Sequence, residues 1–94
     1  MTHKREALTL DELLVLLMEE CAEVSQAASK CLRFGYDTKG PDNYGINRKV
    51  LAGEIGDLLG VVDALPDIEQ YLVTTARNAK LRKAEEAKHK YGVK

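Results

Sequence analysis

The apolar residues in the first third of the chain recur at helical spacing, and this pattern constrains the fold more than any other feature. They follow steps of four and three residues: Leu10, Leu14, Leu17, Cys21, Val24, Ala28 and Cys31. Residues at this spacing lie on one face of an α-helix, so the pattern predicts a long helix that packs against other helices. Thr9 and Glu12 form a capping-box sequence at its start, and Gly35 is expected to end it.

Two further helices are predicted. The second runs from Arg48 to about Leu65, with Asn47 as its N-cap and Pro66 as its terminator. Pro66 can also open the third helix, expected from about Asp67 to Lys90, which is apolar in its first half and basic in its second. Residues 35–46, with several Gly, Asp and Asn, form the inter-helix loop. The second helix repeats the seam of the first with Leu51, Ile55, Leu58, Val62 and Leu65.

The chain of 94 residues shows no strand pattern and no sign of a second domain. We therefore predict an all-α fold, a single helical domain over residues 1–94 in which residues 1–8 are a flexible N-terminus. Three helices, two of them with long apolar seams, leave apolar surface uncovered unless another copy packs against it. We expect a helical bundle of three main helices per chain, completed by homo-oligomerisation as a homodimer or homotetramer.

Charge and cysteine content narrow the class of protein. Lys plus Arg number 14 against 15 Asp plus Glu, a formal charge of -1, so no general field attracts nucleic acid or an anionic membrane. No stretch is long and apolar enough to span a bilayer, and the first residues lack a signal sequence. Cys21 and Cys31 stand roughly 15 Å apart on one helix and cannot pair. We expect both to be small buried residues in a reduced, cytoplasmic protein.

Carboxylates pair at helical spacing beside both seams. Glu20 and Glu23 are three residues apart, as are Glu54 and Asp57, so each pair projects from one helix face. If the seams pack together, four carboxylates converge on a partly buried site, where a divalent cation would remove their repulsion. Oxygen ligands without matching His or Cys favour Mg²⁺ or Mn²⁺ over zinc. A Mg²⁺ ion held in this way keeps positions open for substrate phosphates.

Two interpretations of the carboxylates are open on pattern alone. They are either such a metal site or solvated helix faces in an ordinary mixture of acids and bases. The order of the two pairs favours the site. Residues 19–23, EECAE, followed by residues 54–57, EIGD, resemble the EExxE and ExxD signature of the MazG-type all-α nucleoside triphosphate pyrophosphohydrolases. The resemblance covers roughly residues 10–91, and the family includes the dimeric all-α dUTPases and the small dCTP pyrophosphatases.

The resemblance implies Mg²⁺-dependent cleavage of a nucleoside triphosphate between its α and β phosphates, which gives the monophosphate and pyrophosphate. By position, the residues that match the metal ligands of the family are Glu20, Glu23, Glu54 and Asp57. Glu19 matches the leading acid of the motif, either an outer ligand or a residue that orients the attacking water. Lys83 and the segment KHKY that ends at Tyr91 are similar to the family's phosphate contacts.

Basic and aromatic side chains complete the candidate substrate site. Lys80 and Lys83 of the third helix can hold phosphates. Lys30 and Arg33 end the first helix, where the helix dipole favours cations in any case. Phe34 either stacks on a base or plugs the core. Lys30 also stands where some relatives carry an aromatic residue, so base preference cannot be carried over from them.

Two other functions fit the same sequence. A MazG-like regulator would bind nucleotide or metal through the same acids with little turnover. A plain helical dimerisation module would leave the acids solvated and would gain no stability from Mg²⁺, whereas either site hypothesis predicts such a gain by mass action.

Overall fold

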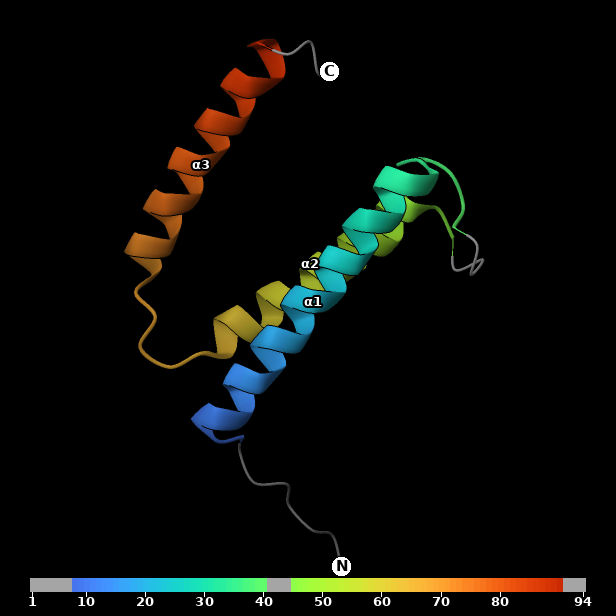
Figure 1. Cartoon of the computed structure of the whole chain (residues 1–94). Helices are drawn as coiled ribbons and strands as arrows, with labels where there is room; N and C mark the ends of the chain where they lie inside the picture. Colours follow the sequence, from blue (N-terminus) through green and yellow to red (C-terminus); the bar gives the residue numbers. More distant parts are fainter. Residues whose placement is uncertain (1–7, 41–44, 91–94) are drawn as a thin grey trace, which may run out of the picture.

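The computed structural model describes residues 8–40 and 45–90 and contains three α-helices (Figure 1). They are α1 (Leu10–Phe34), α2 (Asn47–Ala64) and α3 (Gln70–Lys90). In the described part of the chain the only β-type pairing is an isolated bridge between Lys39 and Ile46. The all-α prediction is therefore confirmed, while the expected flexible N-terminus lies, apart from Leu8, outside the described residues.

Both predicted ends of α1 are confirmed. The Thr9 hydroxyl accepts a hydrogen bond from the Glu12 N–H at 3.1 Å, and the Glu12 carboxylate accepts one from the Thr9 N–H at 3.0 Å. Gly35 ends the helix with φ 107°, and its N–H donates to the Cys31 carbonyl at 2.9 Å. A Cβ at Gly35 would lie 2.6 Å from the Thr38 hydroxyl oxygen, so both backbone angle and space require glycine here.

The start of α2 corrects one prediction. Asn47 does not cap the helix: Ile46 occupies the N-cap position without a side-chain cap, and Asn47 is the first helical residue. Asn47 is only 3% exposed, and its Nδ2 donates to the Gly35 carbonyl at 2.9 Å. Two backbone hydrogen bonds accompany this contact: the Asn47 N–H donates to the Thr38 carbonyl, and the Arg48 N–H donates to the Tyr36 carbonyl. The asparagine joins the end of α1 to the start of α2, a role that depends on contacts across the loop.

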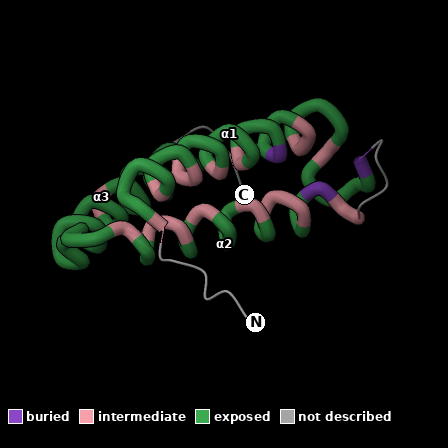
Figure 2. The backbone as a smooth tube through the Cα atoms, turned by 90° about the horizontal axis from the view of Figure 1, so that it is seen from below, coloured by how far each residue is buried: buried purple, intermediate pink, exposed green. Residues whose placement is uncertain are grey.

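Helices α1 and α2 form an antiparallel hairpin, and they are the only described helices in contact with each other (Figure 1). The half-buried positions of the two helices face one another along the hairpin (Figure 2). On α1 the apolar residues of this kind are Leu13, Leu16, Leu17, Val24 and Cys31, around the buried Ala27. On α2 they are Val50, Leu51, Leu58, Val61 and Val62.

The predicted seam of α1 is only partly the face that packs on α2. Its members Leu10, Leu14, Cys21 and Ala28 are exposed. Two neighbouring rows of α1 are apolar, and the 4-3 spacing does not say which of them a given partner covers. The α2 seam is closer to its prediction, since Ile55 is its one exposed member.

Neither cysteine is fully buried in the hairpin. Cys21 is exposed and Cys31 is half-buried, and both are free thiols. The expectation that both are buried is therefore wrong for Cys21, because it lies on the apolar row that α2 does not cover. The expectation that they do not pair is confirmed.

The connection from α2 to α3 is longer than predicted. Pro66 follows the end of α2, as expected, but α3 begins at Gln70 and not near Asp67. Asp67 has φ 58°, a left-handed conformation that interrupts helical geometry. Residues 65–69 therefore separate the two helices, and α3 stands away from the hairpin (Figure 1).

A single chain has almost no core. Ala27, 5% exposed, is the one apolar residue that is buried among those described. The radius of gyration is 16.9 Å, against about 12 Å for a compact chain of this length. Large apolar side chains on all three helices are exposed, although none of the described helices is long and apolar enough to cross a membrane.

Candidate metal centre

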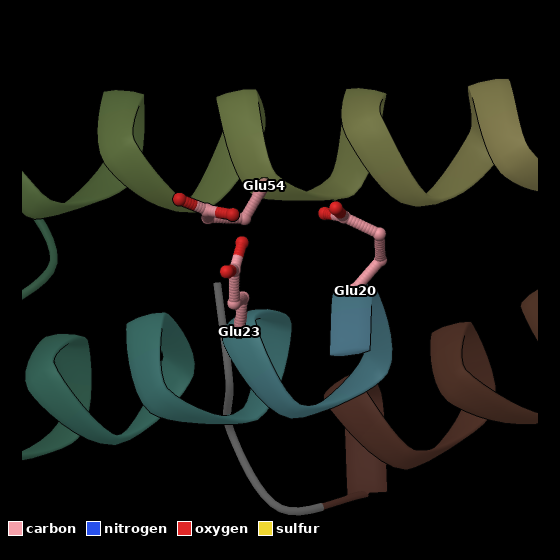
Figure 3. Close-up of side chains that lie close together, drawn as sticks. All are labelled: Glu20, Glu23 and Glu54. Carbon is pink, nitrogen blue, oxygen red and sulfur yellow. The ribbon is translucent and has the colours of Figure 1, made fainter. Parts of the chain in front are cut away.

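Three carboxylates from two helices meet in the middle of the hairpin. Glu20 and Glu23 of α1 and Glu54 of α2 each place one carboxylate oxygen within 4.8 Å of the others (Figure 3). Residues three apart on a helix share a face, which is why both α1 carboxylates point to the same part of α2. The predicted convergence of the two acidic motifs is confirmed for these three residues.

Apolar packing on both sides holds the carboxylates together. Leu17 and Val24 flank the acidic pair on α1, and Leu51 and Leu58 flank Glu54 on α2. These leucines and valine are half-buried between the helices, and burying apolar surface draws the backbones together. The hairpin thus brings the charges closer than their repulsion alone would allow.

Two of the carboxylate oxygens lack a partner. Glu20 and Glu54 are half-buried, and the Oε2 atom of each is buried without a hydrogen-bond partner in the part of the chain that the structure describes. Glu23 is exposed, so it reaches the other two carboxylates from the solvent side. Buried polar atoms are satisfied in the great majority of proteins, so such oxygens call for a bound ion, a water or a proton.

Burial and mutual repulsion favour protonation of the cluster. Burial raises the pKa of Glu20, and the charges of Glu23, Asp57 and Glu19 raise it further. The pKa of Glu54 is raised first by a side-chain hydrogen bond with Glu23, then by burial, and then by the charges of Glu23, Asp57 and Glu20. A proton or a divalent cation would each relieve this repulsion, so a cation bound here would have to displace the proton.

The fourth predicted ligand lies beside the cluster. Asp57 is exposed and is not among the three groups whose oxygens converge, yet its charge raises the pKa of Glu20 and of Glu54. Glu19 is likewise exposed and acts on Glu20 by its charge. The carboxylates that converge are therefore Glu20, Glu23 and Glu54, with Glu19 and Asp57 acting on them by charge.

The cations that end α1 lie further along the hairpin. Lys30 is half-buried two turns beyond Glu23, about 10 Å along the helix axis. Arg33 lies over the ring of Phe34, with its guanidinium carbon 5.0 Å from the ring centroid. Phe34 is therefore neither a core plug nor placed at the carboxylates, and its exposed ring is engaged by Arg33.

The predicted phosphate contacts of α3 do not reach the carboxylates within one chain. Lys80 and Lys83 are exposed, and α3 makes no contact with α1 or α2. Tyr91 lies outside the described residues. Any role of α3 at this cluster therefore requires a movement of the helix or a second copy of the chain.

Arg48 is a cation at the start of α2 that sequence reasoning passed over. Its Nε lies 2.7 Å from the Asp37 carboxylate, and its guanidinium carbon lies 5.8 Å from the Tyr36 ring centroid. It precedes Glu54 by six residues, about 9 Å along α2. The signal in the sequence was an arginine in the first turn of a helix that follows a loop with an acid and an aromatic residue.

Comparisons with protein-family models, with curated proteins and with solved structures find no match to this chain. The resemblance of the two acidic motifs to the MazG-type enzymes therefore stays a prediction.

Proposed function

We propose that this protein is a Mg²⁺-dependent nucleoside triphosphate pyrophosphohydrolase. The observation that carries the proposal is the convergence of Glu20, Glu23 and Glu54 within 4.8 Å, with two buried oxygens that lack partners. Three carboxylates and no nitrogen or sulfur ligand favour a hard cation, Mg²⁺ or Mn²⁺. The two motifs that supply these residues stand in the order that the resemblance requires.

The proposed reaction breaks the bond between the α phosphorus and the oxygen that bridges to the β phosphate. When bound, the metal offsets the phosphate charge and makes a water more acidic. The oxygen of the attacking water bonds to the α phosphorus, pyrophosphate leaves, and a carboxylate takes the water's proton. Glu19 and Asp57 suit the last task, since both lie beside the cluster without being among its converging groups.

The outer phosphates require cations. Lys30 lies on the hairpin itself, and Lys80 and Lys83 are carried by α3. We expect the working form to be a homodimer or homotetramer, because the uncovered seam residues of α1, such as Leu10 and Leu14, are apolar and exposed. The two free thiols suit a reducing compartment such as the cytoplasm.

A second candidate is a regulatory protein that binds metal or nucleotide without turning it over. The separation of α3 from the carboxylates favours it, because the cluster of a single chain has few cations for a triphosphate. A dimerisation module with solvated acids has less support, since oxygens of Glu20 and Glu54 are buried. Turnover separates the first two functions, and stabilisation by Mg²⁺ separates both from the third.

The test is separation of the products by anion exchange after incubation with a panel of NTPs and dNTPs, with Mg²⁺ or with EDTA. We expect monophosphate and pyrophosphate in the presence of Mg²⁺ alone, and their loss in Glu54→Gln. Glu86→Gln, at an exposed acid of α3, is the matched control and should keep full activity. Absence of product from every nucleotide, together with Mg²⁺ binding by calorimetry, would favour the regulatory function.

A further inference from the structure

Helix α3 carries an apolar row that nothing in its own chain covers. Leu72, Ala76 and Ala79 follow at steps of four and three residues and so share one face, which Lys83 continues one turn later. Leu72 is 61% exposed, and α3 contacts neither α1 nor α2. A helix with an uncovered apolar row gains little stability by itself, because most helical stability in proteins comes from packing of that face.

A groove of suitable character lies at the start of α1. It encloses about 370 Å³ and is lined by Leu8, Asp11, Glu12, Val15 and Leu16. Val15 is exposed, and Leu16 is half-buried at the edge of the hairpin. The groove therefore offers apolar contact bordered by negative charge.

One row on α1 and one on α3 each begin with an apolar residue and end with a charged residue of opposite sign. Val15, Glu19 and Glu23 follow each other at four-residue steps on α1, as do Leu72, Ala76 and Lys80 on α3. Eight residues separate the apolar and the charged end of each row, about 12 Å along either axis. If α3 lies parallel to α1 with Leu72 beside Val15, the ammonium of Lys80 comes beside Glu23. Opposite charges at that register stabilise the pairing, while a shift by one turn in either direction would place Leu72 beside Asp11 or Glu19.

We infer that α3 of one copy docks along the Val15–Glu19–Glu23 row of a second copy. The occupant is a second copy because each chain holds its own α3 away from its hairpin and leaves its own groove uncovered. Exchange of α3 in both directions gives a closed two-fold pair that fills both grooves.

The exposed area of the chain agrees with this docking. The chain exposes 7996 Å², whereas a compact monomer of its mass exposes about 5,400 Å². The excess is well above the roughly 800 Å² per partner that a stable interface buries.

The docking brings basic residues of one copy to the carboxylates of the other. From Arg77 onward, α3 carries Arg77, Lys80, Arg82, Lys83 and Lys88 against Glu85 and Glu86. A role of these cations in holding phosphate rests on the proposed function. The docking itself depends only on the apolar rows and the charges, and it can be tested without nucleotide.

The experiment is cross-linking with a water-soluble carbodiimide, which joins a lysine amine to a carboxylate only when the two are in contact. Unlabelled and ¹⁵N-labelled full-length protein are refolded together in equal amounts with EDTA, cross-linked, digested and analysed by mass spectrometry. We expect Lys80 or Lys83 joined to Glu19 or Glu23, with about half of these pairs combining one labelled and one unlabelled chain. Pairs confined to a single isotope would show that α3 folds back on its own chain, and absence of these pairs would show that α3 does not dock there. Either result overturns the proposal.

Matched variants test the register. Leu72→Glu and Val15→Glu, on the two docking rows, should each lose these cross-links while helicity by circular dichroism is kept. Thr74→Glu lies on the opposite side of α3 from Leu72 and should retain them. Cross-links that survive both row variants contradict the inference. The cross-linking readout needs no turnover, so the two proposals can fail separately. A protein that cross-links between chains but hydrolyses no nucleotide contradicts only the proposed function. A protein that hydrolyses nucleotide but forms no such cross-links contradicts only this docking.

Discussion

The carboxyl groups of Glu23 and Glu54 face each other across the α1–α2 interface, and a hydrogen bond between them raises the pKa of Glu54 (Figure 3). Two carboxyl groups can share such a bond only while one of them keeps its proton. If the proposed metal site is correct, this pair is the point at which a bound cation would displace the shared proton. Glu20, whose pKa is raised mainly by burial, is a further carboxylate at which a proton would compete with a bound cation.

Mg²⁺ should stabilise the protein, and Glu54→Gln should remove that effect. Binding to the folded chain alone at a hundredfold excess over Kd adds about 2.7 kcal/mol, which raises Tm by roughly 10 °C or more in a domain of this size. In EDTA, Glu54→Gln should melt at or above the wild-type temperature, because the substitution removes one charge from a repulsive cluster. Differential scanning calorimetry measures both, and an equal Mg²⁺ response in Glu54→Gln would contradict the three-carboxylate site.

Stability without metal should fall as the pH rises above about 4.5, the ordinary value of a glutamate pKa. The pKa values of Glu20 and Glu54 are raised in the folded chain. Such groups stabilise the fold fully below the unfolded pKa and lose this contribution as the pH passes through the folded pKa. Urea unfolding from pH 4.5 to 8 in EDTA measures how the free energy of unfolding changes with pH. In Glu20→Gln this free energy should depend less on pH. Affinity for Mg²⁺, measured by calorimetry, should rise over the same range because binding displaces the shared proton.

Gly35→Ala should destabilise the hairpin by about 1–2 kcal/mol or more, since the left-handed backbone and the nearby Thr38 hydroxyl both oppose a side chain. Gly60→Ala is the matched control. It lies inside α2, where an added Cβ would meet nothing within 4 Å, so alanine should stabilise by up to about 1 kcal/mol. Denaturant unfolding of the two variants should therefore move in opposite directions, and a neutral Gly35→Ala would contradict the close contact with Thr38.

Asn47→Ala should cost about 1–3 kcal/mol, because it removes the hydrogen bond of a buried side chain and leaves the half-buried Gly35 carbonyl with the Thr38 hydroxyl, 3.1 Å away, as its remaining donor. Asn47→Asp keeps the shape but cannot donate to a carbonyl, so it should be at least as destabilising. If Asn47 acted as an N-cap instead, aspartate would be tolerated, since the two residues cap helices about equally well. Urea unfolding of the two variants distinguishes these roles.

The acidic cluster could be predicted in part from the sequence. The three-residue spacing of Glu20 and Glu23 and the seams on both helices were enough to predict that acids of α1 and α2 meet. The inclusion of Glu54 and the lateral position of Asp57 depend on how the two helices are rotated about their axes. A repeat of four and three residues leaves that rotation open when neighbouring rows are both apolar, as on α1.

The sequence by itself determined the three helices, the capping box at Thr9 and the end of α1 at Gly35. These features depend on residues within about four positions of each other, where propensity and hydrogen bonding act locally. Only the tertiary structure decided that Asn47 binds Gly35 across the loop, that Cys21 is exposed and that α3 stands apart from the hairpin. Those outcomes depend on which surfaces meet across long stretches of chain, and many pairings of amphipathic rows satisfy the same local pattern.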